Sequence, residues 1–458
     1  MNSKGLSGIR LTALVAACLV ALPGIALADD VREQALEQRV MDLERQIQEL
    51  ATEIRAQRET STEMAAAIAA APPAAAVAAG KLPIQVTTLT PGSPPGTTVK
   101  IGGFIKIDYL ATKAHDGQFP DGATGRILYV PGQTPVGGEG SDTDLDINAK
   151  FSRLNFGIDN VNENGNKAGA YLEIDFFGNS LGNQVSTNTY GATLRQAYAY
   201  WDNWLAGQTW SNFMDVSALP DAVDFIGPTD GVIFVRQPMI KYTTGGFSAA
   251  LENPETTVIP YGVNAAIQSD RSAVPDLTMR YNWKGAWGTF GISGILRNLE
   301  IDRQATANAA AISESTTGFG MTVGGKWLLG DHDDIRYQLT AGDGLSRYIG
   351  LGVTGDSVFT EDGSLDAVGA LAGYVAWRHV WSPKMRSNVI YARSQYDYPT
   401  ELSQSGVNEY VQSFRFNLFY SPIPKLDVGV ELMQADRELE SGVDGSMTRL
   451  QFTTKYSF

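Results

Sequence analysis

The 458-residue sequence has little of several features on which common functional classes depend. It contains one cysteine and three histidines. With a single cysteine, a chain of this length must be held together by its core or by a closed sheet rather than by internal disulfides. After the N-terminal region, no apolar run reaches the roughly 20 residues that a membrane-crossing helix needs. Acidic residues outnumber basic ones by 50 to 35, for a net charge of −15, which argues against nucleic acid as a partner.

The first 28 residues have the pattern of a secretory signal peptide. Two basic residues precede an apolar stretch at 11–20, and the small residues at 26–28 form a cleavage site. An alternative is a lipoprotein cleavage box at residues 15–18, ending in Cys18, which leaves only a very short apolar region before it. Residues 1–28 are expected to be a signal peptide, and either interpretation predicts export across the inner membrane.

Residues 29–68 are predicted to form a coiled coil in the periplasm. Apolar residues alternate at spacings of four and three, which is the seam of a heptad repeat. Residues 39–44 resemble a short motif of trimeric coiled coils, whereas Ile and Leu on the seam favour a dimer. A single amphipathic helix packed on another surface is the simpler alternative. The residues expected at the association interface are Arg39, Val40, Leu43, Glu44, Ile47, Leu50 and Ile54.

Residues 69–98 are predicted to be a linker. This segment consists almost wholly of Ala, Pro, Gly, Thr and Ser. Such a composition cannot bury a core and favours an extended or mobile chain.

Residues 99–458 alternate apolar and polar side chains, which predicts an all-β fold: a sixteen-stranded antiparallel transmembrane β-barrel. The composition agrees, with 48 Gly, 18 Tyr, 18 Phe and 8 Trp and a mean hydropathy of −0.13. A membrane barrel turns the apolar face to lipid and the polar face to water. The predicted strands are 99–111, 148–160, 167–177, 192–203, 204–210, 232–243, 246–252, 275–284, 287–299, 316–328, 334–342, 366–381, 384–396, 408–421, 424–437 and 445–458.

The connections between these strands alternate in length. Short ones such as 161–166 and 382–383 alternate with long ones such as 112–147 and 343–365. Outer-membrane barrels have short periplasmic turns and long outer loops. An even number of strands leaves both ends of the barrel on the periplasmic side, where the coiled coil would also lie. The last strand ends in Phe458, which resembles the signal read by the outer-membrane assembly machinery.

The inward face of the predicted barrel is rich in cations. A basic side chain facing lipid at the membrane midplane costs about 2–4 kcal/mol, so these residues are expected to face the lumen. Their guanidinium groups suit carboxylate ligands and would concentrate anions. The alternative is that they only brace the barrel, paired with inward acids such as Glu173, Asp175, Asp427 and Glu431. The cations with this alternation are Lys106, Arg153, Arg195, Arg280, Arg297, Lys326, Arg336, Arg378, Arg415 and Arg449.

Signals for an enzyme are weak. His115 and His332 fall in a predicted loop and turn, and His379 has no Ser or Asp partner that the pattern can place. No catalytic residue, metal site or cofactor is therefore predicted.

The layout of the chain resembles the DcaP family of trimeric outer-membrane porins. The resemblance covers the coiled-coil tail, the linker and a barrel that opens with residues 101–106 (Ile-Gly-Gly-Phe-Ile-Lys). It continues in residues 206–210 and 213–215, in the loop at 224–228, and in residues 236–238. Membership would imply a homotrimer with one pore per subunit in outer-membrane lipid, and passive uptake of small anionic solutes such as dicarboxylates.

In trimeric sixteen-stranded porins, the third loop folds inward to narrow the pore. If the loop at 211–231 does the same, its acids would face the basic wall and create a transverse field, with Arg236 close to the constriction. The simpler alternative is an ordinary surface loop. The acids expected in the constriction are Asp215, Asp221, Asp224 and Asp230.

The sequence therefore predicts a passive porin of the bacterial outer membrane that prefers anions. An alternative is a structural anchor with a periplasm-spanning coiled coil and little transport, which would require the loop at 211–231 to plug the pore completely. An outer-membrane enzyme is a third, weaker possibility.

Overall fold

The structure is a computed structural model that describes residues 97–178, 190–269, 272–303, 311–398 and 405–458. The predicted signal peptide, the predicted coiled coil and nearly all of the predicted linker lie outside these ranges. No helix in the described ranges is both long enough and apolar enough to cross a membrane.

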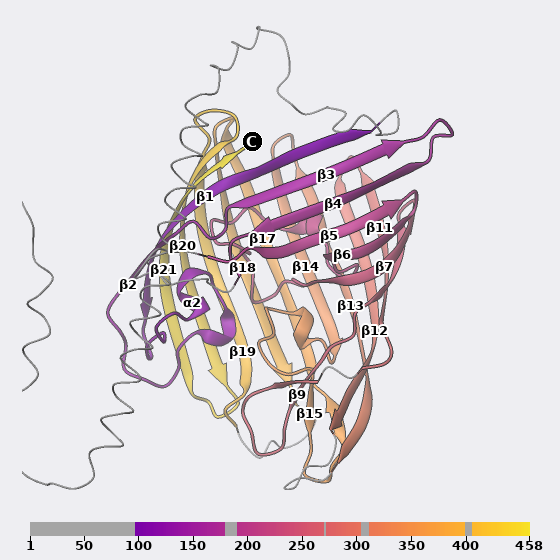
Figure 1. The fold of residues 1–458 in the computed structure, drawn as a ribbon. Helices are drawn as coiled ribbons and strands as arrows, with labels where there is room; N and C mark the ends of the chain where they lie inside the picture. Colours follow the sequence, from indigo (N-terminus) through magenta and orange to yellow (C-terminus); the bar gives the residue numbers. More distant parts are fainter. Residues whose placement is uncertain (1–96, 179–189, 270–271, 304–310, 399–404) are drawn as a thin grey trace, which may run out of the picture. The chain divides into compact units, whose positions relative to one another are not determined.

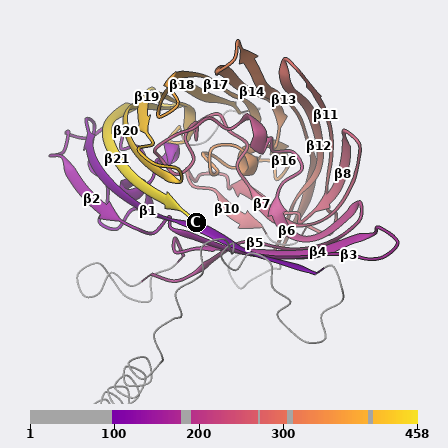
Figure 2. The same cartoon turned by 90° about the horizontal axis from the view of Figure 1, so that it is seen from above.

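The described residues form a closed antiparallel barrel (Figures 1 and 2). Each strand pairs with its neighbour in the sequence, and the last pairs with the first, from Phe104 opposite Ser457 to Ala114 opposite Met447. The wall segments are β1 (Thr98–Ala114), β2 (Asp144–Asn148), β3 (Arg153–Val161), β4 (Lys167–Asp175), β5 (Thr193–Trp201), β6 (Trp204–Trp210), β7 (Arg236–Thr244), β8 (Phe247–Glu252), β11 (Asp276–Gly285), β12 (Gly288–Arg303), β13 (Ile312–Leu329), β14 (Asp333–Asp343), β17 (Gly369–Ser382), β18 (Met385–Asp397), β19 (Asn408–Tyr420), β20 (Leu426–Leu439) and β21 (Asp444–Ser457).

The second strand of the wall is interrupted, which the sequence did not predict. β1 pairs with β3 over its first half and with β2 over its second half, so the two segments share one position in the barrel. Between them, Phe151 turns inward and stacks on Phe225, with ring centroids 4.5 Å apart. The predicted strand at 148–160 is thus broken at 149–152. With β2 and β3 counted as one, the described residues give sixteen strands, as predicted.

The outward face of the barrel is apolar, as the alternation predicts. Leu, Ile, Val and Phe side chains on every second position of the strands are exposed, while their neighbours are buried. Exposed tryptophans gather near the short turns, where they mark one boundary of the apolar band. They are Trp201, Trp204, Trp283, Trp287, Trp327, Trp377 and Trp381.

Short helical turns and a second sheet occupy the longer connections. The turns are α2 (Thr124–Ile127), η1 (Pro131–Gln133), η2 (Val216–Ala218) and η3 (Ser346–Tyr348). The second sheet joins β10 (Ile267–Ser269), β9 (Thr256–Ile259), β15 (Ser357–Phe359) and β16 (Leu365–Ala367).

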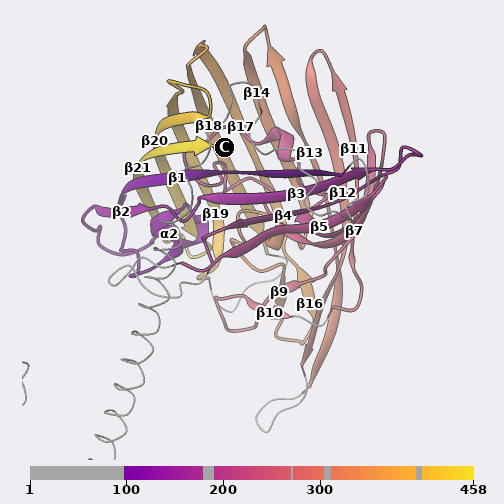
Figure 3. The same ribbon diagram turned by 45° about the horizontal axis from the view of Figure 1, so that its top comes forward.

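This small sheet lies at the end of the barrel opposite the C-terminus (Figures 1 and 3). Val258 of β9 and Leu365 of β16 pack in one buried cluster with Leu299 and Ile301 of β12. The sheet therefore thickens the wall at its outer end.

Candidate functional site

The connection between β6 and β7, residues 211–235, crosses the lumen. Its Val223 carbonyl accepts a hydrogen bond from Nζ of Lys106 on β1, at 3.0 Å. Its Ala218 carbonyl accepts another from the hydroxyl of Tyr374 on β17, also at 3.0 Å. Lys106 and Tyr374 lie on strands that are far around the barrel from β6 and β7. The loop must therefore fold into the lumen to reach them.

The four acids of this loop all contact the wall or another inward loop. Asp215 pairs with Arg280 at 2.6 Å, and Asp221 pairs with Arg386 at 3.0 Å. A carboxylate oxygen of Asp224 lies 3.8 Å from Nη1 of Arg415. Asp230 accepts hydrogen bonds from the hydroxyls of Tyr129, at 2.5 Å, and of Ser413. These contacts hold the loop directly against the wall. A transverse field between separated acids and cations across an open pore would not require such close pairing.

Asp230 is fully buried beneath the segment that contains α2 and η1. Burial raises the pKa of its carboxyl to about 6, although the nearby Arg415 guanidinium and the two hydroxyl donors lower it in part. Burial and the Asp230 charge raise the pKa of Tyr129 well above its ordinary value, so this phenol remains a donor. The loop therefore contains a carboxyl that changes its charge slightly below neutral pH.

Eight of the eleven predicted pore cations make ion pairs with carboxylates. Arg195 binds Glu173 at 2.8 Å and Asp175 at 2.7 Å. Arg297 binds Asp276 at 3.2 Å and Asp356 at 2.8 Å. The remaining pairs are Lys106–Asp108, Arg153–Glu173, Arg280–Asp215, Arg336–Asp334, Arg378–Asp334 and Arg415–Glu431. Much of the inward charge thus braces the wall.

Three predicted cations, Arg236, Lys326 and Arg449, have no carboxylate within 4.0 Å among the described residues. Arg449 is buried; its Nε donates to Thr112 and its Nη2 to the Gly125 carbonyl, while Nη1 has no protein partner there. Lys326 is half-buried on the inward face of β13.

The guanidinium of Arg236 stacks on the ring of Trp210, with its Cζ 5.0 Å from the ring centroid. It lies within electrostatic reach of Arg195 and Arg153. Its position on β7 alternates with buried Gln237 and Met239, so by register it belongs to the outward set. The structure therefore places Arg236 at the start of a strand where the inward loop ends, beside two inward arginines.

Five cations share one row of directly opposed residues across the sheet. From β21 to β11, the residues directly opposite one another are Arg449, Met433, Arg415, Ile390, Ala376, Arg336, Lys326, Thr289 and Lys284. The row begins in the outer half of β21 and ends beside the tight turn after β11. Because barrel strands are tilted by about 35–45°, a row perpendicular to them descends along the pore axis. No acid occupies any of its nine positions.

A cavity of about 370 Å³ opens between the start of the loop and the wall formed by β6, β7, β8 and β11. Three cations line it, namely Lys241, Arg280 and Lys284, together with the single acid Asp215. Since Asp215 is already paired with Arg280, the cavity keeps a net positive charge from its two lysines.

Lys241, Lys284 and Arg386 were not among the residues predicted from the sequence. All three follow the inward alternation of their strands, so the rule that found the other cations could have found them. The seven residues predicted for the coiled-coil interface, from Arg39 to Ile54, lie outside the described residues.

The model of the DcaP outer membrane protein family matches residues 26–458. The chain belongs to this family. The resemblance noted in the sequence is thereby confirmed, and the protein is an outer-membrane porin of the DcaP family rather than an enzyme. No curated protein matches the chain.

Several solved outer-membrane channels are similar to this chain. The outer membrane channel DcaP of Acinetobacter baumannii is 24% identical, with a TM-score of 0.64, covering 80% of this chain and 99% of that chain. OmpT of Vibrio cholerae is 12% identical, with a TM-score of 0.48 and coverage of 80% and 99%. An anion-selective porin from Comamonas acidovorans is 12% identical, with a TM-score of 0.46 and coverage of 79% and 100%.

Proposed function

We propose that the barrel is a passive channel whose basic interior favours small anionic solutes, with dicarboxylates as the leading candidates. The observation that carries this proposal is the row of cations from Arg449 to Lys284, in which Arg449, Lys326 and Lys284 have no carboxylate within 4.0 Å among the described residues. A descending series of fixed charges lowers the energy of an anion at successive depths and keeps each site weak enough to leave.

The cations without a carboxylate partner supply the selectivity in this proposal. A paired arginine is largely neutralised by its partner, so Arg297 and Arg195 contribute mainly to the stability of the wall. By contrast, the half-buried Lys326 has no carboxylate partner among the described residues and can meet a passing carboxylate, whereas the buried Arg449 acts on the solute only through the field of its charge. The lysine-lined cavity beside the loop offers a wider basic chamber on the side of the short turns.

The constriction in this proposal is the loop at 211–235, with Asp215, Asp221, Asp224 and Asp230 as its anchors. These four acids already have partners on the wall or in Tyr129. Little unpaired negative charge therefore opposes the cations that have no carboxylate partner. The narrow passage would therefore be basic on balance, even though the whole chain is acidic.

Uptake by protein-containing liposomes tests the class of solute. Succinate should enter faster than a neutral sugar of similar size, and faster than a diamine of similar length. Equal rates for all three would show a pore without charge preference. A faster diamine would show that the acids rather than the arginines set the selectivity.

A structural anchor with little transport is the second candidate, and one observation favours it. The inward loop is tied to strands around most of the wall, from Lys106 on β1 to Arg280 on β11 and Tyr374 on β17. A loop held so widely could close the lumen. Liposomes that contain the folded barrel and admit none of the three solutes would favour this candidate.

The proposal also includes a homotrimer joined by a periplasmic coiled coil at residues 29–68. Its support is the heptad seam and the motif at 39–44. Native mass spectrometry of the whole protein, compared with a version that lacks residues 29–68, tests it. Three copies in the whole protein and a less stable assembly in the truncated one are expected, whereas a dimer would contradict it.

A further inference from the structure

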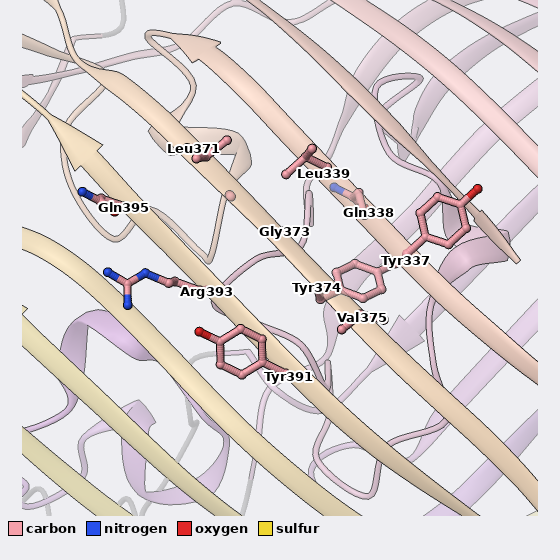
Figure 4. Close-up of a pocket in the computed structure, with 11 residues that line it drawn as sticks. Tyr337, Gln338, Leu339, Leu371, Gly373, Tyr374, Val375, Tyr391, Arg393 and Gln395 are labelled. Atoms are coloured by element: carbon pink, nitrogen blue, oxygen red, sulfur yellow. The ribbon is translucent and has the colours of Figure 1, made fainter.

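The outward face of the barrel has a hollow where β14, β17 and β18 meet. Gly373 of β17 has Leu339 of β14 opposite it on one side and Arg393 of β18 on the other. Because Gly373 has no side chain, the row of outward side chains is interrupted there. The result is a groove of about 390 Å³ whose walls include Leu339, Leu371, Val375, Tyr391 and Arg393 (Figure 4).

The groove is mainly apolar, with the polar Gln395 and the cation Arg393 on its β18 side. Leu371, Val375 and Leu339 are each about half exposed on the outward face. Figure 4 shows Arg393 and Tyr391 on one strand flanking Gly373. The Arg393 guanidinium lies over the ring of Tyr410, 4.1 Å from its centroid, and Nη1 donates to Gln412 at 3.0 Å. Among the described residues, no carboxylate lies within 4.0 Å of it.

The depth of the groove places Arg393 near the outer boundary of the apolar band. Gly373 is eight residues from Trp381, which belongs to the tryptophan group at the opposite boundary. At about 3.3 Å per residue and a tilt of about 40°, this separation corresponds to about 20 Å of an apolar band about 25 Å tall.

At the same depth in the membrane as Arg393, the outward side chains of β19 change from apolar to polar. Phe414 and Phe416 of β19 lie towards the short turns, while Gln412, opposite Arg393, begins a polar stretch. On the next strand, Asp436 lies opposite Gln412 and accepts its amide at 3.2 Å. A charged side chain on the lipid-facing surface is tolerated only near such a boundary.

We propose that this groove binds an anionic glycolipid of the outer leaflet, with an acyl chain in the groove and a phosphate on Arg393. An acyl chain that lies in the apolar groove contacts the protein in place of other lipids and is held in a fixed orientation. Arginine presents a planar fork that matches phosphate oxygens, and Arg393 has donor groups that no protein carboxylate occupies. This inference does not depend on the solute that the lumen transports.

Native mass spectrometry of the delipidated full-length protein, titrated with lipid A, tests the proposal. The protein should retain lipid A in preference to phosphatidylethanolamine and to lipid A without its phosphates. Arg393→Gln should weaken lipid A binding about tenfold, since a hydrogen bond to a charged group contributes enough free energy for that factor. Arg393→Lys should restore part of the affinity.

Two tryptophan substitutions separate the groove from the rest of the outer face. Val375→Trp fills the groove and should weaken lipid A binding, whereas Leu432→Trp adds the same ring to an exposed site on β20 and should not. Solute uptake should be unchanged in every variant, which shows that each has folded.

Three outcomes would overturn the proposal. One is equal lipid A binding by the protein and by the Arg393→Gln and Val375→Trp variants. Another is equal binding of phosphatidylethanolamine. The third is association of copies through this face, detected as loss of the oligomer in Val375→Trp without any specific lipid binding.

Discussion

Gly231 of the inward loop lies against Gly373 of β17, backbone to backbone. A Cβ atom at Gly231 would overlap the carbonyl group of Gly373. The loop is therefore held against the wall at a point where neither residue has a side chain. The same Gly373 opens the groove on the outer face, so the wall is only one backbone thick at this position.

Gly231→Ala is expected to push the loop away from β17. Overpacking of this kind costs about 1–3 kcal/mol, and the loop is the part most able to move. Single-channel conductance should change, and thermal stability should fall. Gly294→Ala is the matched control, because a Cβ there would meet only the Gly320 carbonyl oxygen at 3.8 Å. If both variants behave like the unaltered protein, the loop does not rest on Gly373.

Replacing two unpaired cations should weaken the preference for anions without unfolding the barrel. In water, a unit charge about 8 Å from a passing ion contributes about 0.5 kcal/mol, or about twofold in relative permeability. Because each charge raises the energy of potassium as it lowers that of chloride, Lys326→Gln with Arg449→Gln should lower the ratio of chloride to potassium permeability by more than the factor of about four expected for chloride alone. Lys384→Gln, in an exposed turn outside the lumen, is the control and should leave the ratio unchanged.

Arg297 is expected to matter for stability more than for selectivity. Its removal leaves the buried Asp356 without a cation and the buried Asp276 with only Arg347, at 3.8 Å. Breaking a buried pair in this way costs about 3–5 kcal/mol. Guanidinium unfolding followed by tryptophan fluorescence should show this loss for Arg297→Ala and little change for Arg303→Ala, at the exposed end of β12. Equal stability of the two variants would contradict a bracing role.

Asp230 predicts a dependence of stability on pH. Burial raises the pKa of its carboxyl to about 6, above the ordinary 3.8, so the folded barrel binds this proton more tightly than the unfolded chain. The stabilisation is complete below about pH 4 and is lost as the pH rises through 6. A pKa difference of about two corresponds to about 3 kcal/mol.

Asp230→Asn should flatten this part of the pH profile, because the amide resembles the protonated acid at every pH. Guanidinium unfolding of both proteins at pH 4, 5, 6 and 7 is the measurement. Parallel profiles would show that another group is responsible for the pH dependence.

The strands could be predicted from the sequence because a two-residue alternation is local and each strand repeats it. The same alternation placed ten cations on the inward face, from Lys106 to Arg449. Arg236 was chosen for its position after the loop; the register of its backbone is outward, but its guanidinium lies beside the inward Arg195 and Arg153. The break at residues 149–152 was missed, because its cause is the distant contact between Phe151 and Phe225.

The pairing of the inward charges could not be read from single strands. Asp221 meets Arg386 from more than 160 positions away in the sequence, and Asp356 reaches Arg297 from another loop. The small sheet of β9, β10, β15 and β16 was likewise missed, since strands of three or four residues have too little alternation to detect. Which cations stay free for a solute therefore became visible only in the folded structure.

The reversal potential of the purified protein in a planar bilayer across a potassium chloride gradient tests the central claim most directly. If the unpaired cations and the acid-free row set the selectivity, the potential should have the sign that chloride permeation gives. It should move towards zero when Lys326 and Arg449 are both replaced by Gln. A potential of the opposite sign, or none at all in an open channel, would contradict an anion-preferring pore.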